Sequence, residues 1–319
     1  MSEVMDGLPD IEQIRTAATR IAPHARVTPV LRSATLDALS GAELYFKCEH
    51  LQRGGAFKFR GACNAVWALS DAQAAHGVVT HSSGNHGNAL ALAAATRGIA
   101  AHVVVPEGAV RAKVEAIERA GAILHRCAPT QAAREAMAAE VQGRTGAVMV
   151  HPYADTRVMA GQGTLALELL QQAAGLDALI TPVGGGGLAS GVAIAAHAID
   201  AGLALFGAEP QGADDAARSL AQGRRVTTIV PDTICDGLRA LIGESNLEAL
   251  RIHRVELITV SDAETVAAMQ LIWSELKQVV EVSSATVLAA ILQQRERFAG
   301  RRVGVVITGG NVDLQALPW

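Results

Sequence analysis

The stretch ALITPVGGGGLASGVAIAA, residues 178–196, decides the fold class. It opens with an apolar, β-rich run, continues with four successive glycines at 184–187, and ends in an alanine-rich helical pattern. Glycines leave backbone N–H groups bare, and a helix N-terminus adds positive potential, so a turn of this kind favours a phosphate. The stretch therefore predicts a strand, a phosphate-binding turn and a helix in direct succession.

The same alternation of strand and helix runs through the chain. Near-continuous apolar strands separated by helices are typical of parallel sheets that are covered on both faces, which predicts an α/β fold. The predicted strands are residues 43–49, 77–81, 101–105, 122–127, 147–151, 178–183, 204–209, 257–260 and 303–308. The predicted helices are residues 62–75, 86–97, 110–120, 130–144, 163–174, 188–201, 262–277 and 284–297.

Composition excludes several classes of protein. The 319 residues are half hydrophobic, enough for more than one compact unit, and the net charge of −4 gives no electrostatic support for nucleic-acid binding. The four cysteines are scattered, which argues against a disulfide framework or a zinc ribbon. The acidic N-terminus does not resemble a signal peptide, and the most apolar stretch, 187–208, contains His197 and Asp200. We expect a soluble cytoplasmic protein with neither nucleic-acid nor membrane partners.

The glycine loop has two other interpretations. A plain tight turn needs fewer glycines. A dinucleotide site would use Glu209 at the end of the next predicted strand as its ribose-binding acid, but the glycine spacing fails because the next glycine is Gly191. No Walker lysine follows the loop, so it suits a single phosphomonoester better than a pyrophosphate.

Lys58 lies between Phe57 and Phe59 in the stretch GGAFKFRGA, residues 54–62. An amine must lose its proton to form a Schiff base, and desolvation by two flanking rings lowers its pKa. Alone, the pattern is more typical of a lysine that extends from a strand edge into water. Together with a phosphate-binding turn, it indicates pyridoxal phosphate.

Two further turns follow predicted strands, where ligands bind in such folds. HSSGNHG, residues 81–87, offers hydroxyls, an amide and N–H groups at a helix start, which suits the carboxylate of an amino acid. ITGGNVD, residues 307–313, places the hydroxyl of Thr308 where it could meet a heterocycle nitrogen. The alternatives are a helix N-cap, a structural role for His86 and an ordinary strand-ending turn.

Taken together, these motifs resemble the serine/threonine dehydratase and serine racemase family, which includes 3-hydroxyaspartate dehydratases. The matching segments are FKFRGA (57–62), SSGNHG (82–87), GGGGL (184–188) and TGGN (308–311), and the resemblance extends from about residue 28 to the C-terminus. It implies the fold type II arrangement of pyridoxal-phosphate enzymes, similar to the tryptophan synthase β subunit, with two open, twisted, mostly parallel sheets flanked by helices. It also implies a large cofactor-binding domain (1–64 plus 153–319), a small mobile domain (65–152) and a homodimer.

The resemblance implies a role for each matching position. Lys58 holds pyridoxal 5'-phosphate as a Schiff base and moves protons at Cα, and Ser83 acts as an acid or base on the opposite face. The implied cofactor-binding residues are Phe57, Lys58, Asn85, Gly184, Gly185, Gly186, Gly187, Leu188 and Thr308. The implied substrate-binding residues are Ser82, Ser83, Asn85, His86 and Arg134, the last matching an arginine that reaches the active site in serine racemase and in 3-hydroxyaspartate dehydratases.

A cation site is implied by the stretch GAEPQGADDA, residues 207–216. It resembles the divalent-cation site of the family, with the carboxylates of Glu209 and Asp215 and the backbone carbonyl of Ala213 as ligands. Oxygen ligands of this kind suit Mg²⁺ or another hard divalent cation such as Ca²⁺. The alternative is a solvated acidic turn.

The expected reaction is α,β-elimination from a small-molecule substrate, a β-hydroxy-L-amino acid such as L-threonine or L-serine, which gives a 2-oxo acid and ammonia. Three alternatives keep the scaffold: elimination from 3-hydroxyaspartate with Arg134 binding the extra carboxylate, elimination from phenylserine in the space beside Ala240, and racemisation with Ser83 as the second base. A fourth is a non-catalytic nucleotide-binding or interaction module, which leaves Lys58 and the SSGNHG loop unexplained.

Departures from the family pattern concern the substrate pocket. Gly54, Gly55 and Ala56 precede the Phe-Lys pair, where the family often has Gly-Ser, and the family's Glu-Pro-Ser-x-Ala segment lacks its proline at Val282. Ala240 stands where serine racemase has a serine near the substrate side chain. The sequence therefore leaves the identity of the β-hydroxy amino acid open.

Overall fold

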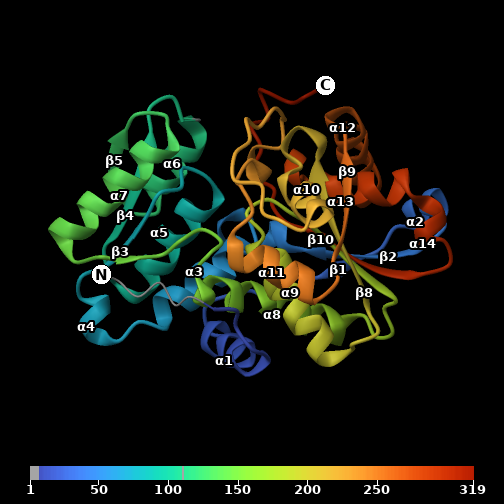
Figure 1. The fold of residues 1–319 in the computed structure, drawn as a ribbon, viewed down its shortest axis with the longest axis horizontal. Helices are drawn as coiled ribbons and strands as arrows, with labels where there is room; N and C mark the ends of the chain where they lie inside the picture. Colours follow the sequence, from blue (N-terminus) through green and yellow to red (C-terminus); the bar gives the residue numbers. More distant parts are fainter. Residues whose placement is uncertain (1–6, 110) are drawn as a thin grey trace.

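The computed structural model describes residues 7–109 and 111–319 (Figure 1). Their strands are β1 (Val30–Leu31), β2 (Glu43–Cys48), β3 (Val78–Thr80), β4 (Ala101–Pro106), β5 (Ile123–Cys127), β6 (Val148–Met149), β7 (Ala178–Pro182), β8 (Ala204–Pro210), β9 (Glu256–Val260) and β10 (Arg302–Ile307). The first helices are α1 (Ile11–Ile21), α2 (Ala34–Ser40), α3 (Lys58–Trp67), α4 (Asp71–Ala74), α5 (Asn85–Arg97), α6 (Arg111–Arg119) and α7 (Gln131–Thr145). The later helices are α8 (Thr156–Gln172), α9 (Gly187–Ile199), α10 (Asp215–Gln222), α11 (Glu244–Ile252), α12 (Asp262–Leu271), α13 (Val282–Gln293) and α14 (Arg295–Phe298). Short 3-10 turns are η1 (Glu49–Leu51), η2 (Arg53–Gly55), η3 (Gln211–Ala213) and η4 (Asp236–Leu238), and η5 (Ile272–Leu276) is a π-helical segment.

The strands form two sheets, a six-stranded one in the order β1-β2-β10-β7-β8-β9 and a four-stranded one in the order β5-β4-β3-β6. In the described residues every strand pair is parallel except β1 with β2. The two sheets lie in separate halves of the molecule, with the four-stranded sheet and α4 to α7 on the left of Figure 1. The α/β fold class with two mostly parallel sheets is therefore confirmed.

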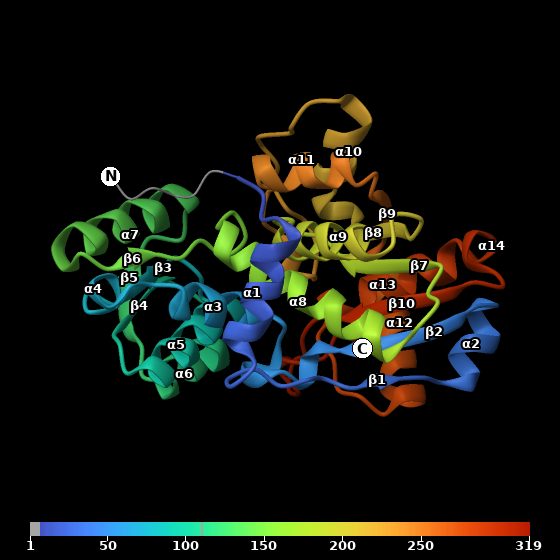
Figure 2. The same ribbon diagram turned by 90° about the horizontal axis from the view of Figure 1, so that it is seen from below.

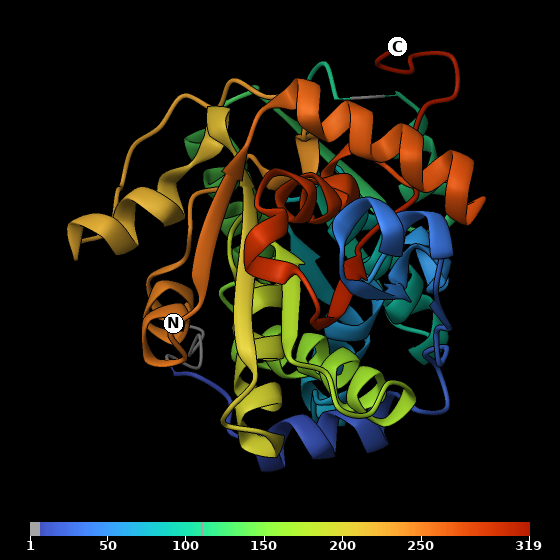
Figure 3. The same ribbon diagram turned by 90° about the vertical axis from the view of Figure 1, so that its right-hand side faces the viewer.

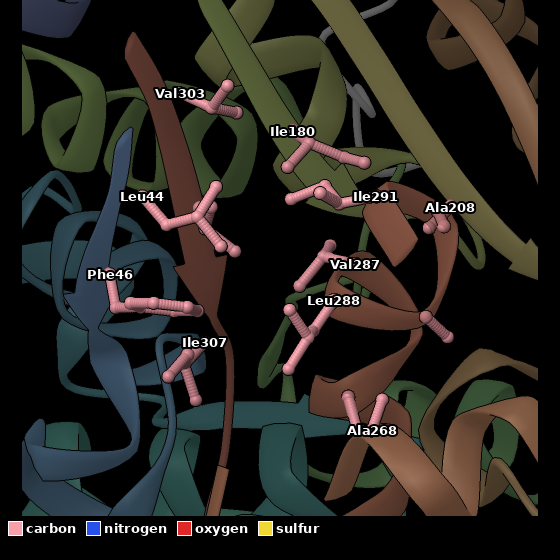
Figure 4. Close-up of a cluster of buried hydrophobic side chains, with 14 of the residues drawn as sticks. Leu44, Phe46, Ile180, Ala208, Ala268, Val287, Leu288, Ile291, Val303 and Ile307 are labelled. Atoms are coloured by element: carbon pink, nitrogen blue, oxygen red, sulfur yellow. The ribbon is translucent and has the colours of Figure 1, made fainter. Parts of the chain in front are cut away.

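Helices cover both faces of the six-stranded sheet. One face packs on α12 and α13, and the other on α1, α8 and α9. Figure 3 shows the yellow-green to orange strands β7 to β9 between these two layers. Figure 4 shows the first of these cores, where side chains of α13 face those of β2, β7 and β10. Its labelled residues include Leu44, Phe46, Ile180, Val287, Leu288, Ile291, Val303 and Ile307.

Each of the nine predicted strands forms within two residues of its predicted bounds, and β1 is additional. The predicted helix 62–75 is wrong as a single helix, because Ser70 caps α4 with a capping box and separates it from α3, which begins at Lys58. The predicted helices 262–277 and 284–297 each divide in two near their C-terminal ends. Val110, where the predicted helix 110–120 starts, lies outside the described residues.

Helix α8 begins seven residues before the predicted start at 163, because the glycines there serve packing. A Cβ on Gly161 would lie 2.6 Å from the carbonyl oxygen of Arg60, and one on Gly163 would lie 2.7 Å from that of Gly191. These glycines let α8 approach α3 and α9 closely. Figure 2 shows α3, α8 and α9 next to one another, beside α1. Tertiary contact thus overrides the low helix propensity of glycine.

The connection from β6 to α8, residues 150–155, leads from the small sheet to the large one. The four motif-bearing turns of the sequence also follow strands: β2 leads to Lys58, β3 to the SSGNHG loop, β7 to the glycine loop and β10 to Thr308. Carboxyl ends of parallel strands are where α/β folds bind ligands, so the topology collects these turns at one place.

Candidate active site

Lys58 opens α3 in a turn that is tied to the end of β10. Ala56 forms an antiparallel bridge with Gly309, and the Phe57 backbone N–H donates to the Thr308 carbonyl at 2.9 Å. Gly55 has a left-handed φ of +73°, and a Cβ there would lie 2.4 Å from Asn311 Oδ1. Glycine is therefore required where the lysine turn meets the TGGN turn.

The amine of Lys58 is poised to lose its proton. Its Nζ donates to the Pro152 carbonyl at 3.0 Å and lies 5.1 Å from the centre of the Phe57 ring. Burial lowers the pKa of Lys58 to about 8, although the nearby carboxylate of Glu281 opposes the shift. With a pKa this close to neutral pH, a useful fraction of the amine is unprotonated, as a nucleophile or general base must be.

The prediction that both rings flank the amine is corrected for Phe59. Successive helical residues turn by about 100°, so side chains two positions apart point to opposite sides of α3. Phe59 is fully buried in the core between α3 and α5, with the Arg53 guanidinium 4.8 Å from its ring centre. Of the two rings, it is that of Phe57 that lies beside Nζ.

All four glycines of the loop are held in close contact. A Cβ on Gly184 would lie 3.0 Å from Leu238 Cα, one on Gly185 2.4 Å from the Tyr153 ring, one on Gly186 2.3 Å from Ile242, and one on Gly187 2.8 Å from the Tyr153 carbonyl. Any larger residue would displace its neighbours. The four-glycine run therefore has a packing cause beyond the exposure of its N–H groups.

The backbone N–H groups of residues 184–189 have no acceptor within the described part of the chain, and the first helical bond of α9 is that of Ser190 to the Gly186 carbonyl. Free N–H groups at a helix N-terminus form a cradle for an anion. Pro152 accepts the hydrogen bond of the lysine amine. The next residue, Tyr153, packs against Gly185, so the same segment contacts both the amine and the glycine loop. These residues fit a phosphorylated aldehyde such as pyridoxal phosphate.

The SSGNHG loop places the N-terminus of α5 beside this region. Ser82 and Ser83 are half-buried, and their hydroxyls make no hydrogen bond within residues 7–109 and 111–319. His86 is buried, its Nε2 lies 3.3 Å from the Val150 carbonyl, and its Nδ1 has no partner in that part of the chain. Burial lowers the pKa of His86 well below its ordinary value, so the ring is neutral.

Asn85 is held by two residues that the sequence analysis did not select. Its Nδ2 donates to Glu281 Oε1 at 2.8 Å, and its Oδ1 accepts from Asn311 Nδ2 at 2.8 Å. Glu281 is buried, and burial raises its pKa to about 7. The signal for both was present, since Glu281 opens the altered Glu-Pro-Ser-x-Ala segment and Asn311 closes TGGN.

Thr308 is buried at the end of β10, and its hydroxyl lies 2.9 Å from Ser284 Oγ. Its backbone carbonyl holds Phe57, as described above. The TGGN turn therefore joins the lysine turn, the first turn of α13 and, through Asn311, the SSGNHG loop.

Arg134, on α7, acts electrostatically on two aromatic side chains. Its charge contributes to lowering the pKa of His81, where burial is the larger cause, and it opposes the rise that burial gives the pKa of Tyr153. His151 stacks edge-on with both His81 and Tyr153. The Nε of Arg134 is buried without a partner in the described residues, so an acceptor at this point would satisfy it.

The predicted cation ligands Glu209, Ala213 and Asp215 lie around the start of α10. The Glu209 carboxylate accepts from the N–H groups of Ala216 and Ala217, and Asp215 Oδ2 accepts from Ile242 N–H. Burial raises the pKa of Glu209 to about 8 and also raises that of Asp215, and Asp215 Oδ1 is buried with no hydrogen-bond partner among the described residues. A buried carboxylate pair with an unsatisfied oxygen fits a hard cation. No group of three or more His, Cys, Asp or Glu side chains suited to a metal occurs in the described residues.

No helix within residues 7–109 and 111–319 combines the length and apolar character needed to cross a bilayer.

Comparison with known proteins agrees with this geometry. The family described as pyridoxal-phosphate dependent enzyme matches residues 21–309. The chain is 49% identical to a beta-hydroxyaspartate dehydratase of Paracoccus denitrificans (98% of this chain, 99% of the relative) and 48% identical to a serine racemase of Arabidopsis thaliana (97% and 95%). The solved structure of maize serine racemase superposes with a TM-score of 0.94 at 45% identity, covering 96% of this chain and 94% of that one. The chain thus belongs to the pyridoxal-phosphate dependent enzymes, in their serine racemase and dehydratase branch with the fold type II architecture.

Proposed function

We propose that this protein is a pyridoxal-phosphate dependent dehydratase of β-hydroxy amino acids, and that its substrate is 3-hydroxyaspartate. The observation that carries the choice of substrate is Arg134, whose buried Nε has no acceptor in the described residues. A guanidinium keeps its charge at all working pH values and binds carboxylates well. The β-carboxylate of 3-hydroxyaspartate would supply the missing acceptor, whereas serine and threonine have no second carboxylate. The name of the Paracoccus relative supports the same choice.

The chemistry divides between cofactor and chain. Pyridoxal phosphate, when bound, supplies an electron sink for the charge that develops at the substrate Cα. Lys58 would hold it through Nζ, residues 184–188 would bind its phosphate, and Thr308 would meet its ring nitrogen. Once the amine of the substrate has replaced Lys58 on the cofactor, the freed Lys58 Nζ, with its lowered pKa, would take the Cα proton and pass it to the β-hydroxyl, which would leave as water. The unsaturated product then hydrolyses to a 2-oxo acid and ammonia.

The substrate α-carboxylate would bind at the N-terminus of α5. The hydroxyls of Ser82 and Ser83 are unengaged within the described part of the chain, and the helix begins at Asn85 without a side-chain cap. Asn85 also has an N–H to spare for the ring oxygen of the cofactor, since its amide carries two and Glu281 takes one. Because His86 is neutral, the carboxylate would be held here by hydrogen bonds and by the positive end of the helix.

Racemisation of serine is the second candidate function. The unengaged hydroxyl of Ser83 favours it, because a racemase needs an acid or base opposite Lys58, and the Arabidopsis relative is named a serine racemase. Chiral analysis of serine recovered after incubation decides between the two. Accumulation of D-serine faster than 2-oxo acid would overturn elimination as the main activity.

Replacing Arg134 with methionine tests the substrate. We expect kcat/KM for 3-hydroxyaspartate to fall by about 10- to 100-fold, the usual cost of losing a charged hydrogen bond, and kcat/KM for L-serine to change by less than about threefold. Release of the 2-oxo acid measures both. Arg144→Met is the matched control, because Arg144 lies on the same helix in an exposed pair with Glu140. Equal losses on both substrates would contradict recognition by Arg134.

We also propose that Glu209, Asp215 and the Ala213 carbonyl bind a divalent cation. Without it, the pKa of Glu209 rises from 4.5 to about 8 on folding, so the folded state binds more protons than the unfolded state between those values, and stability falls as pH rises. We expect the melting temperature in a chelator to drop from about pH 5 to about pH 8, and Mg²⁺ or Ca²⁺ to remove most of that drop. Asp215→Asn should abolish the effect of the cation. A melting temperature indifferent to cations at every pH would refute the site.

Closure of the small domain, residues 65–152, over the substrate is a further part of the proposal. It is supported by an ion pair between Lys113 of α6 and Asp236 of η4, which joins the two halves across the chain. A homodimer is expected from the family resemblance, and light scattering of the purified protein measures it.

A further inference from the structure

His151 is a half-buried histidine that the proposed reaction does not use. It follows strand β6 and directly precedes Pro152, whose carbonyl accepts the hydrogen bond of the Lys58 amine. Its ring makes edge-on contacts with two other rings, that of His81 at 5.2 Å between centres and that of Tyr153 at 4.5 Å. His151 is therefore next in the chain to the contact of the reacting amine and packs against two aromatic side chains.

The backbone determines which ring nitrogen of His151 carries the hydrogen. Nδ1 accepts from the Ala154 N–H at 3.0 Å and from the Tyr153 N–H at 3.4 Å. Burial lowers the pKa of His151 to about 4, so the ring is neutral near pH 7. In a neutral imidazole one nitrogen accepts and the other carries the hydrogen, so the hydrogen of this ring is on Nε2.

Nε2 of His151 is thus a hydrogen-bond donor, and no residue within 7–109 and 111–319 accepts from it. A neutral imidazole does not give up its remaining proton at neutral pH, so this group can bind an acceptor but cannot serve as a general acid. Its orientation is set in advance by the two backbone N–H groups, which lowers the cost of binding. The nitrogen therefore suits an oxygen of a ligand.

The electrostatic neighbours of His151 indicate which part of a substrate would reach it. The positive charge of the Lys58 amine contributes to lowering the pKa of His151. The charge of Arg134 acts on His81 and Tyr153, and the rings of both contact that of His151. The proposed substrate would extend from its Cα beside the amine to its β-carboxylate at Arg134, so its far end would pass His151.

We infer that His151 is a specificity-determining residue whose Nε2–H donates to the β-carboxylate of 3-hydroxyaspartate, together with the guanidinium of Arg134. The inference rests on the proposed function, in which Arg134 binds that carboxylate. Two carboxylate oxygens offer about four acceptor positions, so they can accept from both side chains. Serine and threonine have no second carboxylate for this donor.

Two substitutions of His151 separate substrate binding from a structural role. His151→Asn keeps an oxygen near the place of Nδ1 for the Ala154 N–H and removes the donor at the far edge of the ring. His151→Gln does the reverse, because its longer side chain places an amide N–H near the position of Nε2 and leaves the Ala154 N–H without its acceptor. If His151 binds the carboxylate, the glutamine variant should be the better binder. If the ring only holds the segment after β6, the asparagine variant should be.

Calorimetry of the holoenzyme with L-aspartate and with L-alanine measures the effect. L-aspartate has both carboxylates and no leaving hydroxyl, whereas L-alanine has the α-carboxylate alone. For His151→Asn we expect the dissociation constant of L-aspartate to rise by about tenfold, the cost of a hydrogen bond to a charged group, and that of L-alanine to change by less than about twofold. His151→Gln should keep both constants within about threefold of the unchanged protein.

His125→Asn is the matched control. His125 is another half-buried histidine of the small sheet, but it lies on the edge strand β5, where its Nε2 lies 3.0 Å from Nδ1 of His102. Its replacement should leave both dissociation constants within about twofold.

The unchanged holoenzyme, labelled with ¹⁵N in its histidines, provides the test if His151→Asn does not fold. The Nε2–H signal that His151→Gln lacks should move when L-aspartate is added and stay in place when L-alanine is added.

Three results would overturn the inference while the proposed function stands. One is a His151→Asn variant that keeps the preference of the unchanged protein for L-aspartate over L-alanine. Another is a His151→Gln variant that binds L-aspartate more weakly than His151→Asn, and the third is an Nε2–H signal that L-aspartate does not move. If the unchanged holoenzyme binds L-aspartate no more tightly than L-alanine, the proposed substrate itself is wrong, and this inference with it.

Discussion

Replacing Lys58 with alanine is expected to abolish release of 2-oxo acid, with a loss of at least about a thousandfold, together with the colour of the bound cofactor. The amine is the group that would hold the cofactor and take the Cα proton, and no neighbour replaces it. Glu281, whose carboxylate acts electrostatically on the amine, is the N-cap residue of α13 and cannot form a Schiff base. Activity on 3-hydroxyaspartate and the absorption spectrum measure the two effects.

Lys58→Arg is the matched control for this experiment. It keeps a cation on the same helix start but cannot bind an aldehyde covalently, and its guanidinium does not act as a base. It should therefore be as inactive as the alanine variant, while both melt near the temperature of the unchanged protein from which the cofactor has been removed. Full activity in either variant would refute the assignment of Lys58.

Replacing Arg60 with methionine should destabilise the protein by about 3–5 kcal/mol. The fully buried guanidinium binds both oxygens of Glu49, at 2.7 and 2.8 Å, and both oxygens of Glu168, each at 2.7 Å. Glu168 also accepts from the buried Lys47 at 2.7 Å. Without Arg60, the buried Glu49 carboxylate loses its main cationic partner, and desolvation of an unpaired charge is costly.

Urea denaturation measures this loss of unfolding free energy. Arg15→Met provides the comparison, because it breaks an exposed pair with Glu12 that should contribute less than about 1 kcal/mol. The double variant Arg60→Met with Glu49→Met removes two opposite charges together and should recover part of the stability. A loss below 1 kcal/mol for Arg60→Met alone would show that the network is not essential to the fold.

The sequence was a good guide wherever one physical cause dominated. Near-continuous apolar runs mark buried parallel strands, so the strands were predicted almost to the residue. Helices α1, α2, α10 and α11 were not predicted; α10 and α11 have only eight and nine residues, too few for a clear periodic signal. The start of α8 was misplaced because its glycines serve helix packing, a cause that is visible only in the folded structure.

The site shows the same division. Its four turns could be recognised because each carries its own chemistry and follows a strand. Ser284 and Tyr153 could not, and Glu281 was not selected although its segment was noted, since the importance of these residues comes from partners far away in the sequence. The bond from Asn85 to Glu281 spans 196 positions, and Tyr153 matters through its contact with Gly185. Phe59 was misassigned because adjacency in sequence was taken for adjacency in space.

The connection between the sheets, residues 150–155, links the position of the small sheet to the surroundings of the Lys58 amine. Pro152 accepts the hydrogen bond of the Lys58 amine, and Tyr153 packs against the glycine turn. One short segment therefore contacts both the amine and the turn. A rotation of the small sheet would move this segment. It would therefore disturb the hydrogen bond of the Lys58 amine and the packing of the glycine turn together. In the proposed closure of the small domain, access to the site and the hydrogen bond of the Lys58 amine would therefore change together.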